Sequence, residues 1–195
     1  LSPILDGADQ LTFVDVDDEA LNAWGDATHT TPRAKIAALI ERILSKNPAA
    51  IFVDFDLSGA MSSPGDTDLA KALDAYPRNG PPLLLTRALR SISCPDGVCR
   101  ANSCLPATQS NLQSSPFEGA VAGNANMRWV SSLFAADGDG VVRSWRLWEP
   151  ACEKGKITVI PSPQLAALAL AEPESAGAGK LETYLDYAAQ EAQGI

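Results

Sequence analysis

The chain has 195 residues, 46% of them hydrophobic and 20% charged, which is the composition of an ordinary globular protein and argues against intrinsic disorder. Its formal net charge of −9 argues against nucleic acid or an anionic membrane surface as a partner, because both attract clustered Lys and Arg. The length fits a single domain over residues 1–195, and no apolar stretch approaches the ~20 residues that a transmembrane helix needs.

Two stretches of one design mark the first third of the chain. Residues 11–17 and 50–56 each contain the pattern Phe-Val-Asp-x-Asp, in which apolar residues lead into carboxylates. Between them, Pro32 opens a helix whose apolar residues recur at the spacing of one helical face as far as Leu44. Two strands joined by a helix form a βαβ unit with parallel strands, so both acidic ends are expected at one edge of a sheet, where open α/β sheets bind ligands.

The middle of the chain continues this alternation and then breaks it. A helix is predicted from residue 66 to residue 76, and residues 83–86 read as a third buried strand. Residues 87–116 are irregular and hold three of the four cysteines. A segment of this length without clear periodicity is more often inserted or functional than incidental, so we interpret 87–116 as a cysteine-bearing insertion.

The last third is predicted to contain strands first and helices afterwards. Residues 120–124 read as a short strand, and a turn at 137–140 is expected to join strands at 129–134 and 141–148 into an antiparallel hairpin. A further strand at 157–160, a helix as far as residue 170 and a terminal helix within 177–195 follow. The predicted fold is α/β: a parallel core sheet flanked by helices, with a C-terminal antiparallel hairpin and the cysteine-bearing insertion.

The order of these motifs resembles the type-two CHASE domain, a sensory module outside the cytoplasmic membrane in bacterial receptor cyclases, histidine kinases and serine/threonine kinases. The resemblance covers most of the chain. It is carried by six segments: FVDVDDEAL (13–21), TPR (31–33), IFVDFD (51–56), DLAKAL (68–73), DGDGVVR (137–143) and PSPQLA (161–166).

This resemblance implies a non-enzymatic domain on the periplasmic or extracellular face of the bacterial inner membrane. It further implies flanking transmembrane helices and a cytoplasmic output domain in the full-length protein, with residues 177–195 leading toward the membrane. The chain opens on Leu1 rather than Met, so we expect it to be a fragment of that protein. No catalytic residue and no cofactor is expected, the ligand is an unidentified small molecule or protein, and homodimerisation is left open.

The four cysteines are Cys94, Cys99, Cys104 and Cys152. In an oxidising compartment they would form two disulfides, with three connectivities open. The alternative is a four-cysteine zinc site, but the chain lacks the Cys-x-x-Cys pairs that such sites commonly use. We therefore favour disulfides.

The paired aspartates allow three interpretations. Residues 51–58 resemble the first motif of haloacid-dehalogenase-like phosphatases, whose aspartate nucleophile works with Mg²⁺, but no convincing downstream lysine motif follows. Simple divalent-cation binding by Asp15, Asp17, Asp54 and Asp56 is a second interpretation. The third and plainest is that these carboxylates cap helices and pair with Arg33 or Arg143.

The preferred hypothesis is a sensor domain that binds its ligand at the acidic strand edge and relays the signal to the output domain. The predicted pocket residues are Asp17, Arg33, Asp54, Asp56 and Asp68. The alternatives are the Mg²⁺-dependent phosphatase and a dimerisation or docking module that senses nothing.

Overall fold

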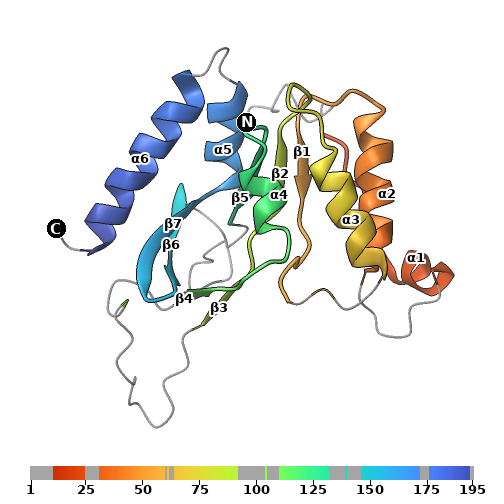
Figure 1. Cartoon of the computed structure of the whole chain (residues 1–195), viewed down its shortest axis with the longest axis horizontal. Helices are drawn as coiled ribbons and strands as arrows, with labels where there is room; N and C mark the ends of the chain where they lie inside the picture. Colours follow the sequence, from red (N-terminus) through yellow and green to blue (C-terminus); the bar gives the residue numbers. More distant parts are fainter. Residues whose placement is uncertain are drawn as a thin grey trace, which may run out of the picture.

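The computed structural model describes residues 11–24, 31–59, 61, 64–91, 104, 110–131, 139, 146–171 and 176–193. Within these residues the chain forms two sheets with their helices. A three-stranded sheet lies between helices, and a four-stranded sheet lies beside it (Figure 1).

The three-stranded sheet is parallel and forms the centre of the fold. Its strands are β1 (Ile51–Val53), β2 (Leu83–Thr86) and β5 (Met127–Val130), in the order β1-β2-β5. β2 pairs in parallel with both neighbours. All four residues of β2 are buried, as expected for a parallel strand covered on both faces. The predicted parallel core is confirmed.

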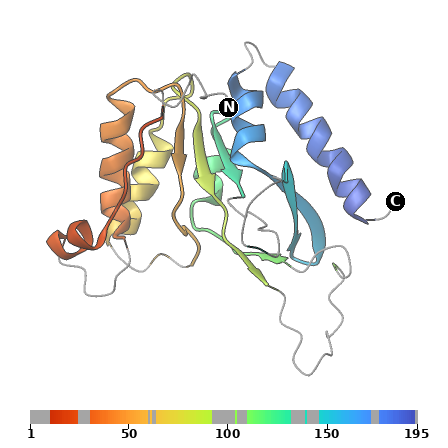
Figure 2. The same cartoon turned by 180° about the vertical axis from the view of Figure 1, so that it is seen from behind.

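Helices cover both faces of the parallel sheet. α3 (Pro64–Asp74) and α4 (Glu118–Ala122) pack on one face, and α2 (Arg33–Leu44) packs beside α3. α5 (Pro163–Ala171) packs on the other face (Figure 2).

Side-chain alternation along the strands separates two apolar clusters. Leu83 and Leu85 of β2 point into the larger cluster with α2, α3 and α4, whereas Leu84 points toward Ala166 of α5. The same alternation applies to β1: its first and third residues are buried in the larger cluster, and Phe52 between them is exposed. The face on which a residue lies therefore follows from its position in the strand.

The second sheet is mixed and consists of β3 (Leu89–Ser91), β4 (Ser110–Leu112), β6 (Trp148–Glu153) and β7 (Lys156–Pro161), in that order. β6 and β7 form an antiparallel hairpin. Its two-residue turn has positive φ at both positions, 49° at Lys154 and 81° at Gly155, as a type I′ turn requires.

Two further helices lie at the ends of the described chain. α1 (Asp18–Ala23) precedes α2, and α6 (Ala176–Gln193) packs along α5 and β7. None of the helices in the described ranges is long and apolar enough to cross a membrane.

Three sequence predictions require comment. Residues 11–17 are extended but form no strand, because their apolar side chains have no core to face: Phe13 is 89% exposed. The predicted βαβ unit is thus built from β1, α3 and β2 instead. Residues 120–124 are not a strand, since α4 occupies 118–122. The predicted hairpin turn at 137–140 lies outside the described residues apart from Asp139, and the observed hairpin is formed further along by β6 and β7.

Candidate functional site

Polar and charged residues follow the carboxyl ends of β1 and β2. Asp54 and Asp56 come directly after β1, Thr86 ends β2, and Arg87 follows it. The carboxyl edge of a parallel sheet is the usual ligand site of open α/β folds. Because successive side chains of a strand point to opposite faces, some residues at this edge lie on one face of the sheet and the others lie on the opposite face.

On the face covered by α3 and α4, the first enclosed cation is Arg33 at the start of α2. Its Nη1 donates to Asp66 Oδ1 at 2.9 Å and its Nη2 donates to the Ser58 carbonyl oxygen at 2.6 Å. The guanidinium carbon lies 5.2 Å from the centre of the Phe117 ring. Both side chains of the ion pair are largely buried, so Arg33 ties α2 to α3 and to the loop after β1.

The second enclosed cation on this face is Arg87, which is only 4% exposed. Its Nη2 forms an ion pair with Glu118, and its guanidinium carbon lies 4.9 Å from the centre of the Trp129 ring. Glu118 also accepts a hydrogen bond from the Ser115 backbone N–H at 3.2 Å. Glu118 of α4 therefore holds Arg87 through an ion pair, and the guanidinium packs over the indole ring of Trp129 in β5.

Three buried donors at this position lack partners. Arg87 Nε, Arg87 Nη1 and Trp129 Nε1 find no hydrogen-bond acceptor in the described part of the chain. Most buried polar atoms in folded proteins are hydrogen-bonded, so a group of unsatisfied donors requires an explanation. Such a group offers hydrogen-bond donors, and one positive charge, to an acceptor that comes from outside.

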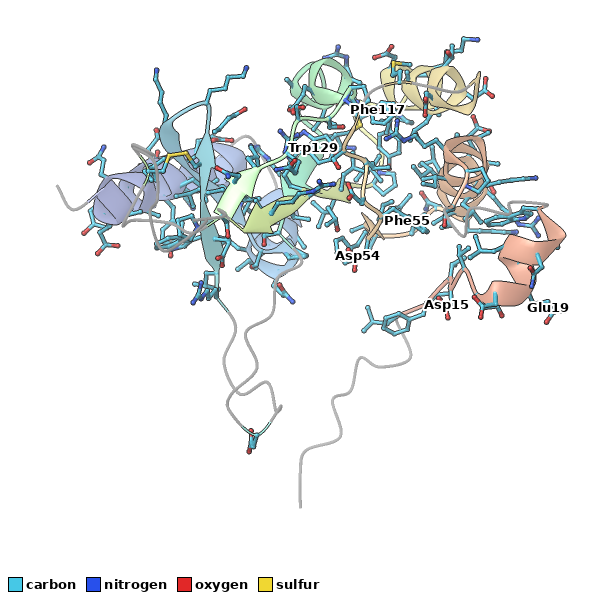
Figure 3. The ribbon with its side chains drawn as sticks, turned by 90° about the horizontal axis from the view of Figure 1, so that it is seen from below. Asp15, Glu19, Asp54, Phe55, Phe117 and Trp129 are labelled. Atoms are coloured by element: carbon cyan, nitrogen blue, oxygen red, sulfur yellow. A yellow bond between two sulfur atoms is a disulfide. The ribbon has the colours of Figure 1, made fainter. Side chains whose placement is uncertain are left out.

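The opposite face of the edge is acidic. Thr86 Oγ1 donates to Asp54 Oδ1 at 2.8 Å, which fixes the ends of β1 and β2 together. Figure 3 shows Asp54 on the side of the sheet away from Phe117 and Trp129. Asp54 and the two enclosed arginines therefore border the same edge but do not share a face.

Asp56 lies beyond the end of β1 and accepts a hydrogen bond from the Ser58 backbone N–H at 2.8 Å. Partial burial opposes its ionisation, but the hydrogen bonds from Ser58 and the positive charges of Arg90 and Arg33 outweigh burial and lower its pKa below the usual 3.8. Asp56 is therefore an anion at neutral pH.

Two predicted pocket residues lie elsewhere. Asp17 caps α1, accepting a hydrogen bond from the Ala20 backbone N–H at 2.8 Å. Figure 3 shows the nearby Asp15 on the segment that leads into α1. Asp68 is exposed on α3, whereas Asp66, one half-turn earlier, is the residue that meets Arg33. The charge of Arg33 thus contributes to the lowered pKa of Asp56. Asp54 lies on the other face of the sheet, Asp17 caps α1, and Asp68 is exposed on α3.

The sequence analysis missed Arg87, Glu118 and Trp129. One signal could have revealed Arg87, because it is a charged residue directly after a strand predicted to be fully buried. No local signal indicates Glu118 or Trp129, which come from separate elements.

The acidic residues do not gather around a metal position in the described ranges, where no group of three potential ligands is found. Asp54 and Asp56 bond to different partners, Thr86 and Ser58. Both the divalent-cation and the phosphatase interpretations would require these carboxylates to converge, so neither gains support from this geometry.

A disulfide joins Cys104 to Cys152 in β6, with 5.7 Å between their Cα atoms. Sulfurs in a disulfide cannot ligate zinc, so this pair agrees with the disulfide interpretation. The pair is compatible with one of the three connectivities. Cys94 and Cys99 lie outside the described residues.

Comparison with known protein families identifies the family of this chain. The family model of the CHASE2 domain matches residues 2–193. The chain belongs to the CHASE2 family. No curated protein and no solved structure matches this CHASE2 domain.

The resemblance inferred from the six segments is thereby confirmed. CHASE2 domains are sensory domains, typically extracytoplasmic and typically non-catalytic. This CHASE2 domain has a mixed α/β structure in which a parallel three-stranded sheet adjoins a mixed four-stranded one.

Proposed function

We propose that this CHASE2 domain is the ligand-binding part of a bacterial transmembrane receptor, and that its ligand binds at the carboxyl edge of the parallel sheet. The observation that carries the proposal is the concentration of charged side chains at this edge of a sensory domain. Arg33 and Arg87 are held on one face, and Asp54 and Asp56 follow the neighbouring strand.

The proposal includes the route of the signal. The edge residues belong to loops and helices that contact one another, since Arg33 connects α2 with α3 and Arg87 connects β2 with α4. A ligand that binds one arrangement of these elements better than another shifts the population toward it. We propose that α6 then passes the change toward the membrane and to a cytoplasmic output domain.

A thermal-shift screen of the chain against amino acids, organic acids, sugars, phosphoesters and divalent metals tests the proposal. A ligand that binds only the folded state raises the melting temperature. The shift is measured for each variant relative to its own unliganded melting temperature. We expect Arg33→Ala and Asp54→Ala to reduce the shift, whereas Arg42→Ala and Asp74→Ala, which remove exposed charges of the same kind from α2 and α3, leave it unchanged.

The remaining residues of the predicted pocket are tested in the same screen with the variants Asp17→Ala, Asp56→Ala and Asp68→Ala. If a ligand raises the melting temperature of every edge variant as much as that of the wild type, its site lies elsewhere. Turnover of a phosphoester that disappears in Asp54→Asn would replace the sensor proposal with the phosphatase.

A further inference from the structure

We propose that Arg87 and Trp129 bind a small organic carboxylate, which accepts hydrogen bonds from the donors that these two side chains leave unsatisfied. The inference deepens the proposed function and rests on it for the location of the site, because Arg87 lies at the same sheet edge. It assigns the ligand class, which neither the family nor the fold supplies.

The first argument is the state of the donors. Arg87 is enclosed, and of its three guanidinium nitrogens only Nη2 has a partner in the described chain. Trp129 Nε1, on the ring beneath the guanidinium, is buried and unsatisfied as well. All three unsatisfied atoms are N–H donors. A ligand that satisfies them must therefore present acceptor atoms.

The second argument is charge. Glu118 is the anion that Arg87 faces, but the Glu118 side chain is 45% exposed while that of Arg87 is 3% exposed. Water screens the exposed carboxylate, whereas the enclosed guanidinium has lost its own hydration. A second anion on the enclosed side compensates that loss, which a neutral acceptor does less well.

The third argument concerns the kind of anion. Arg87 and Glu118 together are neutral, and the whole chain carries a net charge of −9. A monovalent carboxylate adds less repulsion than a divalent phosphate, and its two oxygens can accept hydrogen bonds from different unsatisfied donors. Because Arg87 is enclosed, we infer that the ligand gains access when the exposed Glu118 side chain rotates away from it.

The test uses the whole chain and propionate as the probe, with propionamide as its neutral isostere and inorganic phosphate as the competing oxyanion. The chain has four tryptophans, and the indole N–H signal of Trp129 is identified as the one missing in Trp129→Phe. We expect propionate to move the Trp129 signal and raise the melting temperature, while propionamide does neither. Phosphate is expected to bind at least ~10-fold more weakly, given the charge argument.

Variants of the ion pair should act in opposite directions. We expect Arg87→Gln to weaken propionate binding by about 10-fold or more, because the charged donor is lost. Glu118→Gln should strengthen it about 3-fold or more, because a competing anion is removed. A merely structural ion pair predicts that both changes act in the same direction. Trp129→Phe keeps the ring beneath Arg87 and removes only the N–H, so binding should weaken by a smaller factor, about 3-fold.

The outcomes separate this inference from the proposed function. Equal binding of propionamide, tighter binding of phosphate, or no response to any probe by the folded chain would overturn the inference, and the last result would mean that only water occupies the site. A ligand from the screen that depends on Asp54 and Arg33 but not on Arg87 would overturn it while the sensor proposal stands. Conversely, propionate binding that requires Arg87 but never alters receptor output would retain the site and refute the sensor proposal.

Discussion

Two enclosed arginines lie over aromatic rings, and their donors are satisfied to different extents. Arg33 donates to a buried carboxylate and to a backbone oxygen, both within the protein. Arg87 has a single, half-exposed carboxylate as partner. A cation that bonds to groups of several elements stabilises the fold, whereas unsatisfied buried donors are available to a ligand. At the residue scale, Arg33 therefore has a structural role in addition to its place at the proposed binding edge, whereas Arg87 offers the unsatisfied donors on which the proposed carboxylate site rests.

The structural role of Arg33 predicts a large loss of stability in Arg33→Ala. The change removes the guanidinium that pairs with the buried Asp66 carboxylate, and breaking a buried pair in this way costs about 3 kcal/mol or more of unfolding free energy. Urea denaturation measures the loss. Arg42→Ala on the exposed part of the same helix is the control and should change stability by less than ~0.5 kcal/mol. Equal effects of the two changes would contradict the role assigned to Arg33.

Tyr76 gives a prediction on pH. Burial raises its pKa to about 12, and its hydroxyl donates to the Pro81 carbonyl oxygen at 2.8 Å. The unfolded chain ionises this tyrosine near its ordinary value of 10.0, so the contribution to stability is complete below pH 10 and is lost between pH 10 and 12.

In Tyr76→Phe, the melting temperature should therefore fall less steeply between pH 10 and 12 than in the wild type. At neutral pH the change should cost about 1 kcal/mol, since the Pro81 oxygen keeps a second donor in Asn126 Nδ2. Tyr187→Phe, which removes an exposed hydroxyl, is the control. Parallel pH profiles for Tyr76→Phe and the wild type would refute the assignment.

At the element scale, a close contact between two helices sets the position of Arg33. α2 and α3 approach at Gly65, where an added Cβ would lie 3.0 Å from the Ala34 backbone nitrogen. That backbone atom cannot rotate aside, so the helices would have to separate. The ion pair between Arg33 and Asp66 spans the same contact. The position of Arg33 at the sheet edge thus depends on Gly65, which has no side chain.

Two glycine substitutions should consequently have opposite signs. Gly65→Ala should destabilise the protein by about 1–3 kcal/mol through overpacking. Gly119→Ala in α4, where an added Cβ meets nothing within 4 Å, should stabilise it by about 0.4–1 kcal/mol, because alanine restricts the unfolded chain. Chemical denaturation of both variants measures this difference. A Gly65→Ala variant as stable as the wild type would mean that α2 and α3 can separate without penalty.

At the scale of the whole molecule, a backbone hydrogen bond connects the two sheets. The Ser131 N–H, directly after β5, donates to the Pro161 carbonyl oxygen of β7 at 2.8 Å. The Cys104–Cys152 disulfide closes a sequence separation of 48 residues onto β6 of the second sheet. Cross-links across long separations restrict the unfolded chain most, so this bond is expected to stabilise the folded chain.

Replacing Cys104 and Cys152 together by alanine should lower the unfolding free energy by about 2–4 kcal/mol under non-reducing conditions. Urea denaturation monitored by circular dichroism measures the change. The ligand-induced shift at the parallel sheet should persist in this variant where the fold is retained, because the disulfide lies in the other sheet. An unchanged denaturation midpoint would mean that the disulfide adds nothing to stability.

Local sequence patterns determined the secondary elements and the family. The apolar runs of β1 and β2 and the apolar face of α2 predict these elements correctly, because burial periodicity is a local property. The order of short motifs was enough to indicate the CHASE2 domain. The exceptions are 11–17, where the pattern of a strand occurs but no strand of the described chain pairs with it, and 120–124, where α4 forms in place of the predicted strand.

Tertiary structure alone decided which charges meet. Arg33 finds Asp66, 33 residues away, rather than Asp54 or Asp68, and alternation along the sheet sends Asp54 and Arg87 to opposite faces. Such pairings depend on the relative placement of distant backbone segments, which no local pattern encodes. The sequence by itself therefore determined which residues are acidic, basic and near a strand end, and only the packing of α4 and β5 around β2 left Arg87 enclosed with unsatisfied donors.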